Sequence, residues 1–181
     1  NKTFDYRAKI AAASTVHHSD IVLVLIDENS LDVMDPLLGR WPWPRYIYHD
    51  FLSFMALAQA KSVTFDILFT ETQQDPLCLD TSPAFYNDQL FAKGTQDFGA
   101  VIHAFKLSID KLIKKNELSL GNVIPNNIIE RFSVPLDDSY LKSATNYFLP
   151  YDELLLNTHQ IGFVDVDSDS DGIFRRVDLL R

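Results

Sequence analysis

Cysteine is almost absent: Cys78 is the only one among 181 residues, so no internal disulfide bond can form. This usage fits the cytosol and also extracytoplasmic bacterial domains that fold without disulfides. The sequence also has no apolar run approaching the ~20 residues of a membrane-spanning helix, and no signal-peptide pattern. Because the chain begins at Asn1 and not at Met, we expect a fragment or a processed chain.

Positive charge is scarce as well. Sixteen lysines and arginines stand against 25 aspartates and glutamates, which gives a formal net charge of −9. Nucleic acids and anionic membrane surfaces are bound by clustered basic residues, so the charge balance argues against both kinds of partner. The hydrophobic content of 46% is that of a globular protein, and the length suits one domain with a full core.

Three apolar runs predict the strands of a central sheet: residues 21–27 (IVLVLID), 62–69 (SVTFDILF) and 99–107 (GAVIHAFKL). Their apolarity is continuous and does not alternate, which is typical of parallel strands covered on both faces. Between the first two runs, residues 45–60 are expected to form a helix with a wide apolar stripe. That stripe comprises Ile47, Phe51, Phe54, Met55 and Ala58.

Further helices are expected over 83–95 and 150–158. A strand, a helix and a second strand form a crossover unit, whose strands should be parallel and right-handed. The sequence therefore predicts an α/β fold with a central, mainly parallel sheet sandwiched by helices. A C-terminal antiparallel hairpin over 161–180 is expected to join or abut this sheet.

The turn of that hairpin contains a calcium-like pattern. Asp167, Asp169 and Asp171 alternate and are followed by Gly172, as in the first half of a calcium-binding loop, with Asp178 at the twelfth position. An Asp-Gly pair is equally a strong hairpin signal, because glycine accepts a positive φ angle. We interpret the segment first as a hairpin turn, and calcium bound by the three alternating aspartates remains an alternative that the hairpin does not exclude.

Two arginines follow this turn and weigh against calcium. Arg175 takes the position where a calcium loop normally has a water-binding ligand, and Arg176 comes next. Guanidinium groups beside a dication would oppose its binding. Along a strand the two side chains point to opposite faces, so one of them is expected to reach acids in the core.

The densest group of unusual residues is GRWPWPR, residues 39–45. Trp41 and Trp43 could stack on a ligand while Arg40 and Arg45 grip an anion. The simpler interpretation is a rigid loop in which the indole rings cover the sheet and Arg45 pairs with a buried acid.

Two acids at the predicted strands are candidates for that pairing. Asp27 ends the first run, where open α/β sheets place their ligands, and Asp66 lies within the second run, where we expect it to face a covered layer. Two neighbouring carboxylates would also allow acid–base catalysis, but pairing with Arg45 or Arg40 is the simpler account. His103, alone in the third run, is expected to be a hydrogen-bonded core histidine.

These segments together resemble a known family. A strand ending in IDENSL, then GRWPWPR entering a helix, VTFDILFTE, and finally GFVDVDSDSDGIFRRVDLL are similar, in this order, to the type-two CHASE domain (cyclases/histidine kinases associated sensory extracellular domain). The resemblance covers residues 20–181, although 107–149 carry no matching motif. The family's signature positions are occupied by Asp27, Trp41, Pro42, Trp43, Pro44, Arg45, Asp66, Asp171, Gly172, Arg175 and Arg176.

The resemblance implies a non-catalytic sensor outside the membrane, attached to a bacterial cyclase, diguanylate cyclase or kinase. It implies that residues 1–19 are a membrane-proximal helix and linker, pairing with a second copy, and that 20–181 form the sensor domain. The signal would be a small molecule, an ion or a protein, with no nucleic acid and no cofactor beyond possible calcium. The alternatives are a hydrolase that uses Asp27 and Asp66, and a calcium-stabilised structural module.

Overall fold

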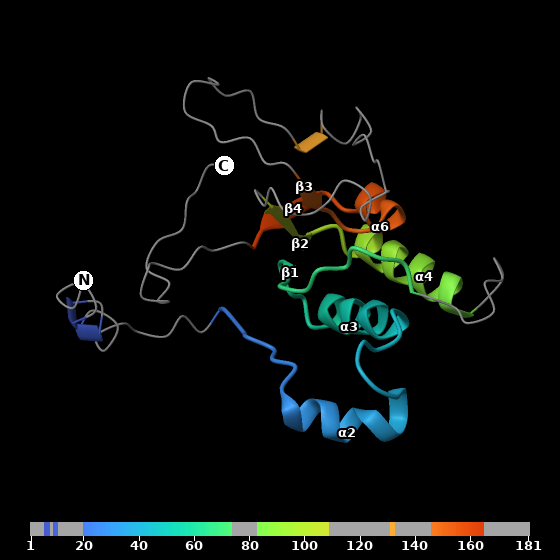
Figure 1. Cartoon of the computed structure of the whole chain (residues 1–181), viewed down its shortest axis with the longest axis horizontal. Helices are drawn as coiled ribbons and strands as arrows, with labels where there is room; N and C mark the ends of the chain where they lie inside the picture. Colours follow the sequence, from blue (N-terminus) through green and yellow to red (C-terminus); the bar gives the residue numbers. More distant parts are fainter. Residues whose placement is uncertain are drawn as a thin grey trace. The chain divides into compact units, whose positions relative to one another are not determined.

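The computed structural model describes residues 6–7, 9–10, 20–73, 83–108, 131–132 and 146–164. The chain divides into two compact units, Asn1–Pro42 and Trp43–Arg181. Figure 1 shows the helices and strands of both units along the chain. No helix in the described part of the chain combines the length and the apolarity needed to cross a membrane.

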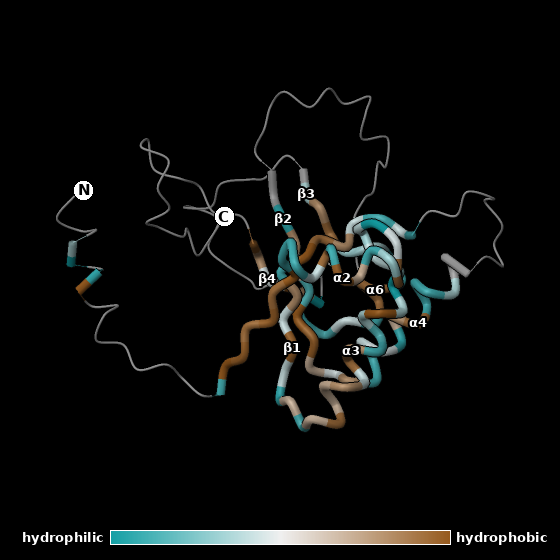
Figure 2. Tube along the Cα trace, turned by 90° about the horizontal axis from the view of Figure 1, so that it is seen from below, coloured by the Kyte–Doolittle hydropathy of each residue, from teal (hydrophilic) through white to brown (hydrophobic). Residues whose placement is uncertain are grey.

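The first unit contains helix α2 (Glu28–Leu38), and an extended segment, residues 21–27, precedes it. This segment is continuously hydrophobic (Figure 2), yet Ile21–Ile26 are 39–79% exposed and form no strand. The prediction of a buried strand over 21–27 is therefore wrong for this unit. An apolar run favours extended backbone, but a strand also needs a neighbour to complete its hydrogen bonds, and the described residues of this unit include none.

Helix α2 has well-defined ends. Asp27 is its N-cap, and its carboxylate accepts hydrogen bonds from the backbone N–H and the hydroxyl of Ser30 at 2.9 and 2.7 Å. At the other end, Gly39 adopts a φ of +79° and donates its N–H to the carbonyl of Asp35 at 2.9 Å. Glycine accepts this left-handed conformation without a steric cost, so the chain can leave the helix there.

The second unit alternates helices and strands. Its elements in chain order are α3 (Tyr46–Leu57), β1 (Val63–Phe65), α4 (Pro83–Phe98), β2 (Val101–Ser108), β3 (Asn146–Phe148), α6 (Asp152–Asn157) and β4 (Gln160–Phe163). The helices expected over 45–60, 83–95 and 150–158 are thus confirmed, and so is the strand over 99–107. The strand expected over 62–69 is present but shorter.

The four strands form one mixed sheet centred on β2. Strand β2 pairs in parallel with β1 and with β4, and antiparallel with β3. The predicted α/β class is confirmed. The sheet is mixed and not mainly parallel, because it includes the antiparallel strand β3, which the sequence did not predict. Helices on both faces of the sheet remain a prediction, and the C-terminal hairpin lies largely outside the described residues.

The core lies between the sheet and the helices α3, α4 and α6. Val63 and Phe65 of β1 are buried while Thr64 between them is exposed, so β1 presents alternate residues to the core. Helix α4 packs against both α3 and α6. The buried core cluster comprises Tyr48, Leu52, Val63, Phe65, Phe69, Phe91, Ala92, Val101, Tyr151 and Leu154.

Helix α3 buries a different stripe from the predicted one. Tyr48 and Leu52 are buried, with Phe51 and Met55 packed against them, whereas Phe54 is 62% exposed. The predicted stripe is therefore wrong at Phe54 and at Ala58, which is also exposed. The helix is apolar over most of its circumference, so two overlapping stripes at 3/4 spacing compete, and only tertiary packing selects between them.

Candidate functional site: a buried ion pair and a groove across the sheet

A buried ion pair lies at the start of α3. Arg45, the N-cap residue of this helix, and Asp88 of α4 are separated by 3.7 Å between Nε and Oδ1, and their side chains are only 13% and 2% exposed. The guanidinium also lies over the ring of Phe69, 4.6 Å from its centroid. The prediction that Arg45 pairs with a buried acid is confirmed, but that acid is Asp88 and neither Asp27 nor Asp66.

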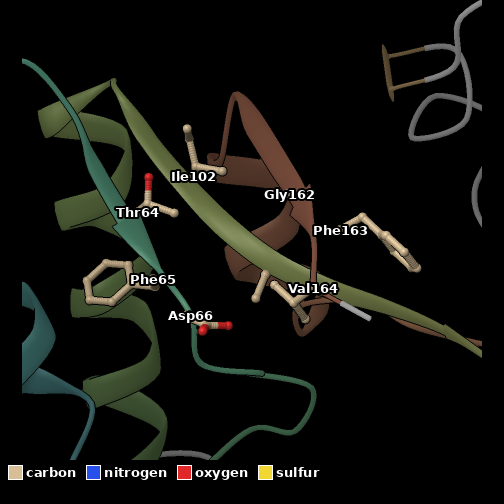
Figure 3. A pocket seen from close by; sticks show the side chains of 8 residues that line it. Thr64, Phe65, Asp66, Ile102, Gly162, Phe163 and Val164 are labelled. Atoms are coloured by element: carbon tan, nitrogen blue, oxygen red, sulfur yellow. The ribbon is translucent and has the colours of Figure 1, made fainter. Parts of the chain in front are cut away.

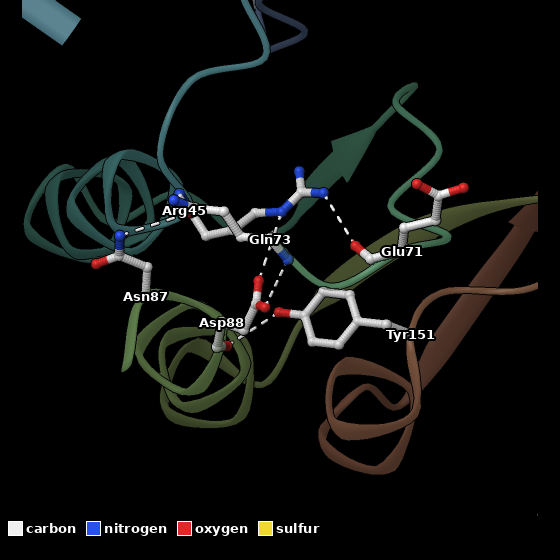
Figure 4. Close-up of polar contacts among 6 residues, drawn as sticks. All are labelled: Arg45, Glu71, Gln73, Asn87, Asp88 and Tyr151. Atoms are coloured by element: carbon white, nitrogen blue, oxygen red, sulfur yellow. Dashed lines mark hydrogen bonds and ion pairs between the residues drawn. The ribbon is translucent and has the colours of Figure 1, made fainter. Parts of the chain in front are cut away.

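Backbone and amide groups complete this polar cluster (Figure 4). The backbone N–H of Gln73 donates to Asp88 Oδ2 at 2.7 Å, and the side-chain oxygen of Gln73 accepts from the backbone N–H of Arg45 at 3.0 Å. Arg45 donates from its terminal nitrogen to the carbonyl of Glu71 at 3.2 Å. The hydroxyl of Tyr151 donates to the backbone carbonyl of Asp88 at 2.9 Å. The cluster therefore joins α3, residues 71–73, α4 and the residue preceding α6.

The electrostatics of the cluster are dominated by burial. Burial raises the pKa of the Asp88 carboxyl, and the Gln73 N–H and the Arg45 charge oppose this effect only in part. Burial likewise raises the pKa of Tyr151, so its hydroxyl stays neutral and acts as a hydrogen-bond donor. The carboxylate and the guanidinium offset each other inside the protein, and we interpret the cluster as a structural clamp.

Asp66 has a different environment. It directly follows β1, is exposed, and forms no ion pair with any residue that the structure describes. The expectation that Asp66 faces a covered layer and pairs with Arg45 or Arg40 is therefore wrong. Because Val63 and Phe65 point into the core, the opposite face of the sheet receives Thr64 and then Asp66.

A groove crosses this opposite face of the sheet (Figure 3). Its volume is about 410 Å³, and it spans the carboxyl ends of β1 and β4 together with the middle of β2. In Figure 3 the Asp66 side chain and Val164 point toward the centre of this groove. The lining residues are Thr64, Phe65, Asp66, Ile102, Ala104, Gly162, Phe163 and Val164; we call this surface the sheet groove.

The remaining predicted residues of the first unit lie on its surface. Asp27 caps α2, and its hydrogen bonds with Ser30 lower the pKa of its carboxyl. Arg40 is exposed just after this helix, and Trp41 is 41% exposed. In the second unit, Trp43 is only 7% exposed. Trp43 and Arg45 both contribute to the core. For residues 43–45, the structure therefore agrees with the simpler interpretation of GRWPWPR as a rigid structural segment.

His103 is a core histidine, as expected. It is fully buried, its Nε2 lies 3.1 Å from the hydroxyl oxygen of Thr95, and its ring stacks on Phe65 with centroids 5.5 Å apart. Burial lowers the pKa of His103 to about 4, so the ring is neutral at physiological pH.

The calcium-like segment is not tested by the structure. Asp167, Asp169, Asp171, Arg175 and Arg176 lie outside the described residues. Within the described part, no group of three or more histidine, cysteine, aspartate or glutamate side chains converges on a metal position. Calcium binding therefore remains a prediction from the sequence.

The family follows from comparison of the whole chain. A protein-family model of the CHASE2 domain matches residues 1–181, so the resemblance seen in the motifs is confirmed. The chain belongs to the CHASE2 family. CHASE2 domains are extracellular sensory domains of receptors. Neither the curated proteins nor the solved structures contain a significant match to this chain.

Sequence reading missed the acidic partner of this CHASE2 domain's arginine. Asp88 was assigned no role, although Phe91, Ala92 and Thr95 are buried with it on one face of α4. These residues follow Asp88 at spacings of three, four and seven, as expected for a single helical face. A carboxylate on such a stripe requires a partner, and this was the signal available in the sequence.

Proposed function

We propose that this CHASE2 domain is the extracytoplasmic sensor of a bacterial receptor anchored in the inner or plasma membrane. Its cytoplasmic effector is a cyclase, a diguanylate cyclase or a kinase, and its ligand is a small molecule, an ion or a protein. The match to the family model over residues 1–181 carries this proposal. The acidic net charge supports it, because it disfavours nucleic acid as the partner.

The two parts of the site have separate roles in this proposal. The Arg45–Asp88 clamp holds α3, α4 and the loop residues 71–73 of the second unit in a fixed arrangement. It is not accessible to a ligand, since both side chains are largely buried. The sheet groove lies on the opposite face of the sheet and is lined by residues in or next to β1, β2 and β4. We infer that a ligand in the groove acts through small shifts of β1, β2 and β4.

A hydrolase mechanism through Asp27 and Asp66 receives no support from the geometry of either residue. Asp27 accepts two hydrogen bonds from Ser30 as the cap of α2. A catalytic carboxylate has to be directed at its substrate, whereas the hydrogen bonds of Asp27 are directed at its own helix. The sensor is therefore the function that we retain.

The location of the domain is tested in the full-length receptor. Alkaline phosphatase, which is active only outside the cytoplasm, would be fused after residue 181, and a fluorescent protein that folds only in the cytoplasm would be fused at the same position. We expect phosphatase activity and no fluorescence. The reverse pattern would place the domain in the cytoplasm and overturn the proposal.

Ligand binding is tested by thermal unfolding of the 181-residue chain against metabolites, ions and cell-wall fragments. A compound that binds only the folded state raises the melting temperature as its concentration exceeds Kd. At least one class of compound should do so. If every class leaves the melting temperature unchanged, direct sensing of a small ligand is excluded and a protein signal becomes the proposal.

We also propose that two receptor copies pair through residues 1–19, beside the membrane. Cysteine pairs introduced at successive positions of this segment in the full-length receptor should cross-link with helical periodicity under mild oxidation. Cys78 would be replaced by serine in the parent, so that every cross-link reports on the introduced residue. Absence of cross-linking at all positions would refute this arrangement.

A further inference from the structure

The Arg45–Asp88 pair is held together by charge and not by a hydrogen bond. The Nε atom of Arg45 and the Oδ1 atom of Asp88 are 3.7 Å apart, beyond the ~3.2 Å over which an N–H group donates to an oxygen. Both atoms are buried, and neither has a hydrogen-bond partner in the described part of the chain. The attraction between them therefore requires both side chains to be ionised.

The surroundings of Asp88 give its negative charge little support. An ionised carboxylate offers about four acceptor positions, yet among the described residues only the backbone N–H of Gln73 donates to it. The hydroxyl of Tyr151 donates to the backbone carbonyl of Asp88 instead. Burial raises the pKa of the Asp88 carboxyl, and the negative charge of Glu153 on α6 adds to this effect, against the Gln73 hydrogen bond and the charge of Arg45.

The guanidinium group of Arg45 lies at the border between the interior and solvent. Its side chain is more exposed than that of Asp88, and a terminal nitrogen donates to the carbonyl of Glu71, an exposed residue. In Figure 4 the dashed lines from Arg45 to Glu71 and to Asp88 diverge. If Asp88 became neutral, burial of the guanidinium would no longer be compensated, and its accessible side is already next to solvent.

We propose that the Arg45–Asp88 pair is a latch that acid releases. Uptake of one proton by Asp88 discharges the pair, the guanidinium turns into solvent, and the start of α3 and residues 71–73 loosen from α4. The pair is the charged contact between these segments, since Arg45 precedes α3 and Asp88 belongs to α4. This inference rests on the proposed sensor function and names the proton as a signal.

Two measurements on the 181-residue chain test the latch. The chemical shift of the Asp88 carboxyl carbon would be followed from pH 7 into acid, as far as the chain stays folded. Release of Arg45 would be followed by acrylamide quenching of Trp43, which is buried two residues before Arg45. Trp41→Phe in the parent leaves Trp43 as the only tryptophan. We expect quenching to rise at least twofold, with the same midpoint as the Asp88 titration.

Four variants of this parent assign the transition. Asp88→Asn has no charge at any pH, so its quenching should already be high at pH 7 and should not depend on pH. Glu153→Gln removes a charge that opposes ionisation and should move the Asp88 midpoint to lower pH, which a purely structural role would not do. Asp97→Asn, an exposed carboxyl on the same helix, should leave the midpoint unchanged. His103 also titrates toward pH 4, and His103→Leu should keep the transition.

Three results would overturn the inference. In the first, the Asp88 carboxyl does not titrate before far-ultraviolet circular dichroism reports unfolding. In the second, Asp88 and the quenching of Trp43 have different midpoints. In the third, Asp88→Asn retains the acid-dependent quenching of the parent. The first two results need no Asp88 variant, so they decide even if Asp88→Asn does not fold. None of them affects the sensor function, which fails only if the reporter fusions place the domain in the cytoplasm.

Discussion

Replacing Arg45 by alanine leaves the buried Asp88 carboxylate without its cation. The side chain of Asp88 is 2% exposed, and its Oδ1 atom has no hydrogen-bond partner among the described residues, so Arg45 at 3.7 Å is its principal neutralising group. Removing one partner of a buried ion pair typically costs about 3–5 kcal/mol of unfolding free energy. For a chain of this size, that loss lowers the melting temperature by roughly 6–20 °C.

The pH dependence separates the charge from the packing. Burial already raises the pKa of Asp88, and loss of the Arg45 charge would raise it further. A carboxyl whose folded-state pKa lies above its unfolded value stabilises the protein in acid, and this contribution is lost as pH rises through the folded-state pKa. The Arg45→Ala variant should therefore be much less stable than wild type at pH 7, and the difference should shrink as pH falls toward 4.

A smaller part of the loss does not depend on pH. It comes from the hydrogen bond to the Glu71 carbonyl and from the contact with Phe69, and it amounts to about 1–2 kcal/mol. Adding Asp88→Asn to Arg45→Ala removes the unpaired charge while the amide oxygen still accepts from Gln73. The double variant should therefore recover part of the stability at pH 7.

Urea denaturation followed by tryptophan fluorescence at pH 7 and at pH 4.5 measures these differences. Lys93→Ala is the control, because Lys93 and Asp97 form an exposed pair on α4 that contributes at most about 1 kcal/mol. An equal loss for Arg45→Ala at both pH values would refute the charge argument. A loss no larger than that of Lys93→Ala would show that the guanidinium is in water.

The remaining predictions concern packing, titration and metal. Leu52→Ala should lower the unfolding free energy by about 2–5 kcal/mol, whereas Leu57→Ala on the same helix should be nearly neutral, because the side chains are 1% and 84% exposed; urea titrations that give equal losses would contradict the assigned face of α3. His103 has a folded-state pKa of about 4 against 6.5 unfolded, so its contribution is present above pH 6.5 and declines by up to about 3 kcal/mol as pH falls toward 4. His103→Leu should flatten that decline in the same titrations, and an unchanged slope would assign it to other groups. Millimolar calcium should raise the melting temperature if residues 167–178 bind it, and Asp169→Asn should abolish the effect; calorimetry without heat of binding would exclude the site.

The helices of the second unit were predictable because local signals and packing agree there. Pro150 and the acidic residues after it mark the start of α6, and the structure begins that helix at Asp152. The run over 99–107 likewise became β2, the central strand, with neighbours on both edges. Residues 21–27 have the same local preference, but a local preference does not supply a neighbouring strand.

Strand β3 was not predictable from sequence pattern. It has only three residues, Asn146–Phe148, and alternation over three residues carries almost no information. Its position is set by the antiparallel register with Lys106–Ser108 at the far end of β2. The antiparallel part of the sheet is therefore a tertiary feature, which explains why the sequence indicated a mainly parallel arrangement.

The roles of the acids depended on which face each residue occupies. The apolar run over 62–69 is continuous, so it hides the alternation of β1 and suggested that Asp66 is covered; the buried Val63 and Phe65 instead place it on the open face. On helix α4, by contrast, Asp88 lies on the same helical stripe as Phe91 and is therefore buried. Arg45 could neutralise only a buried acid within its reach, and that acid is Asp88 and not the exposed Asp66.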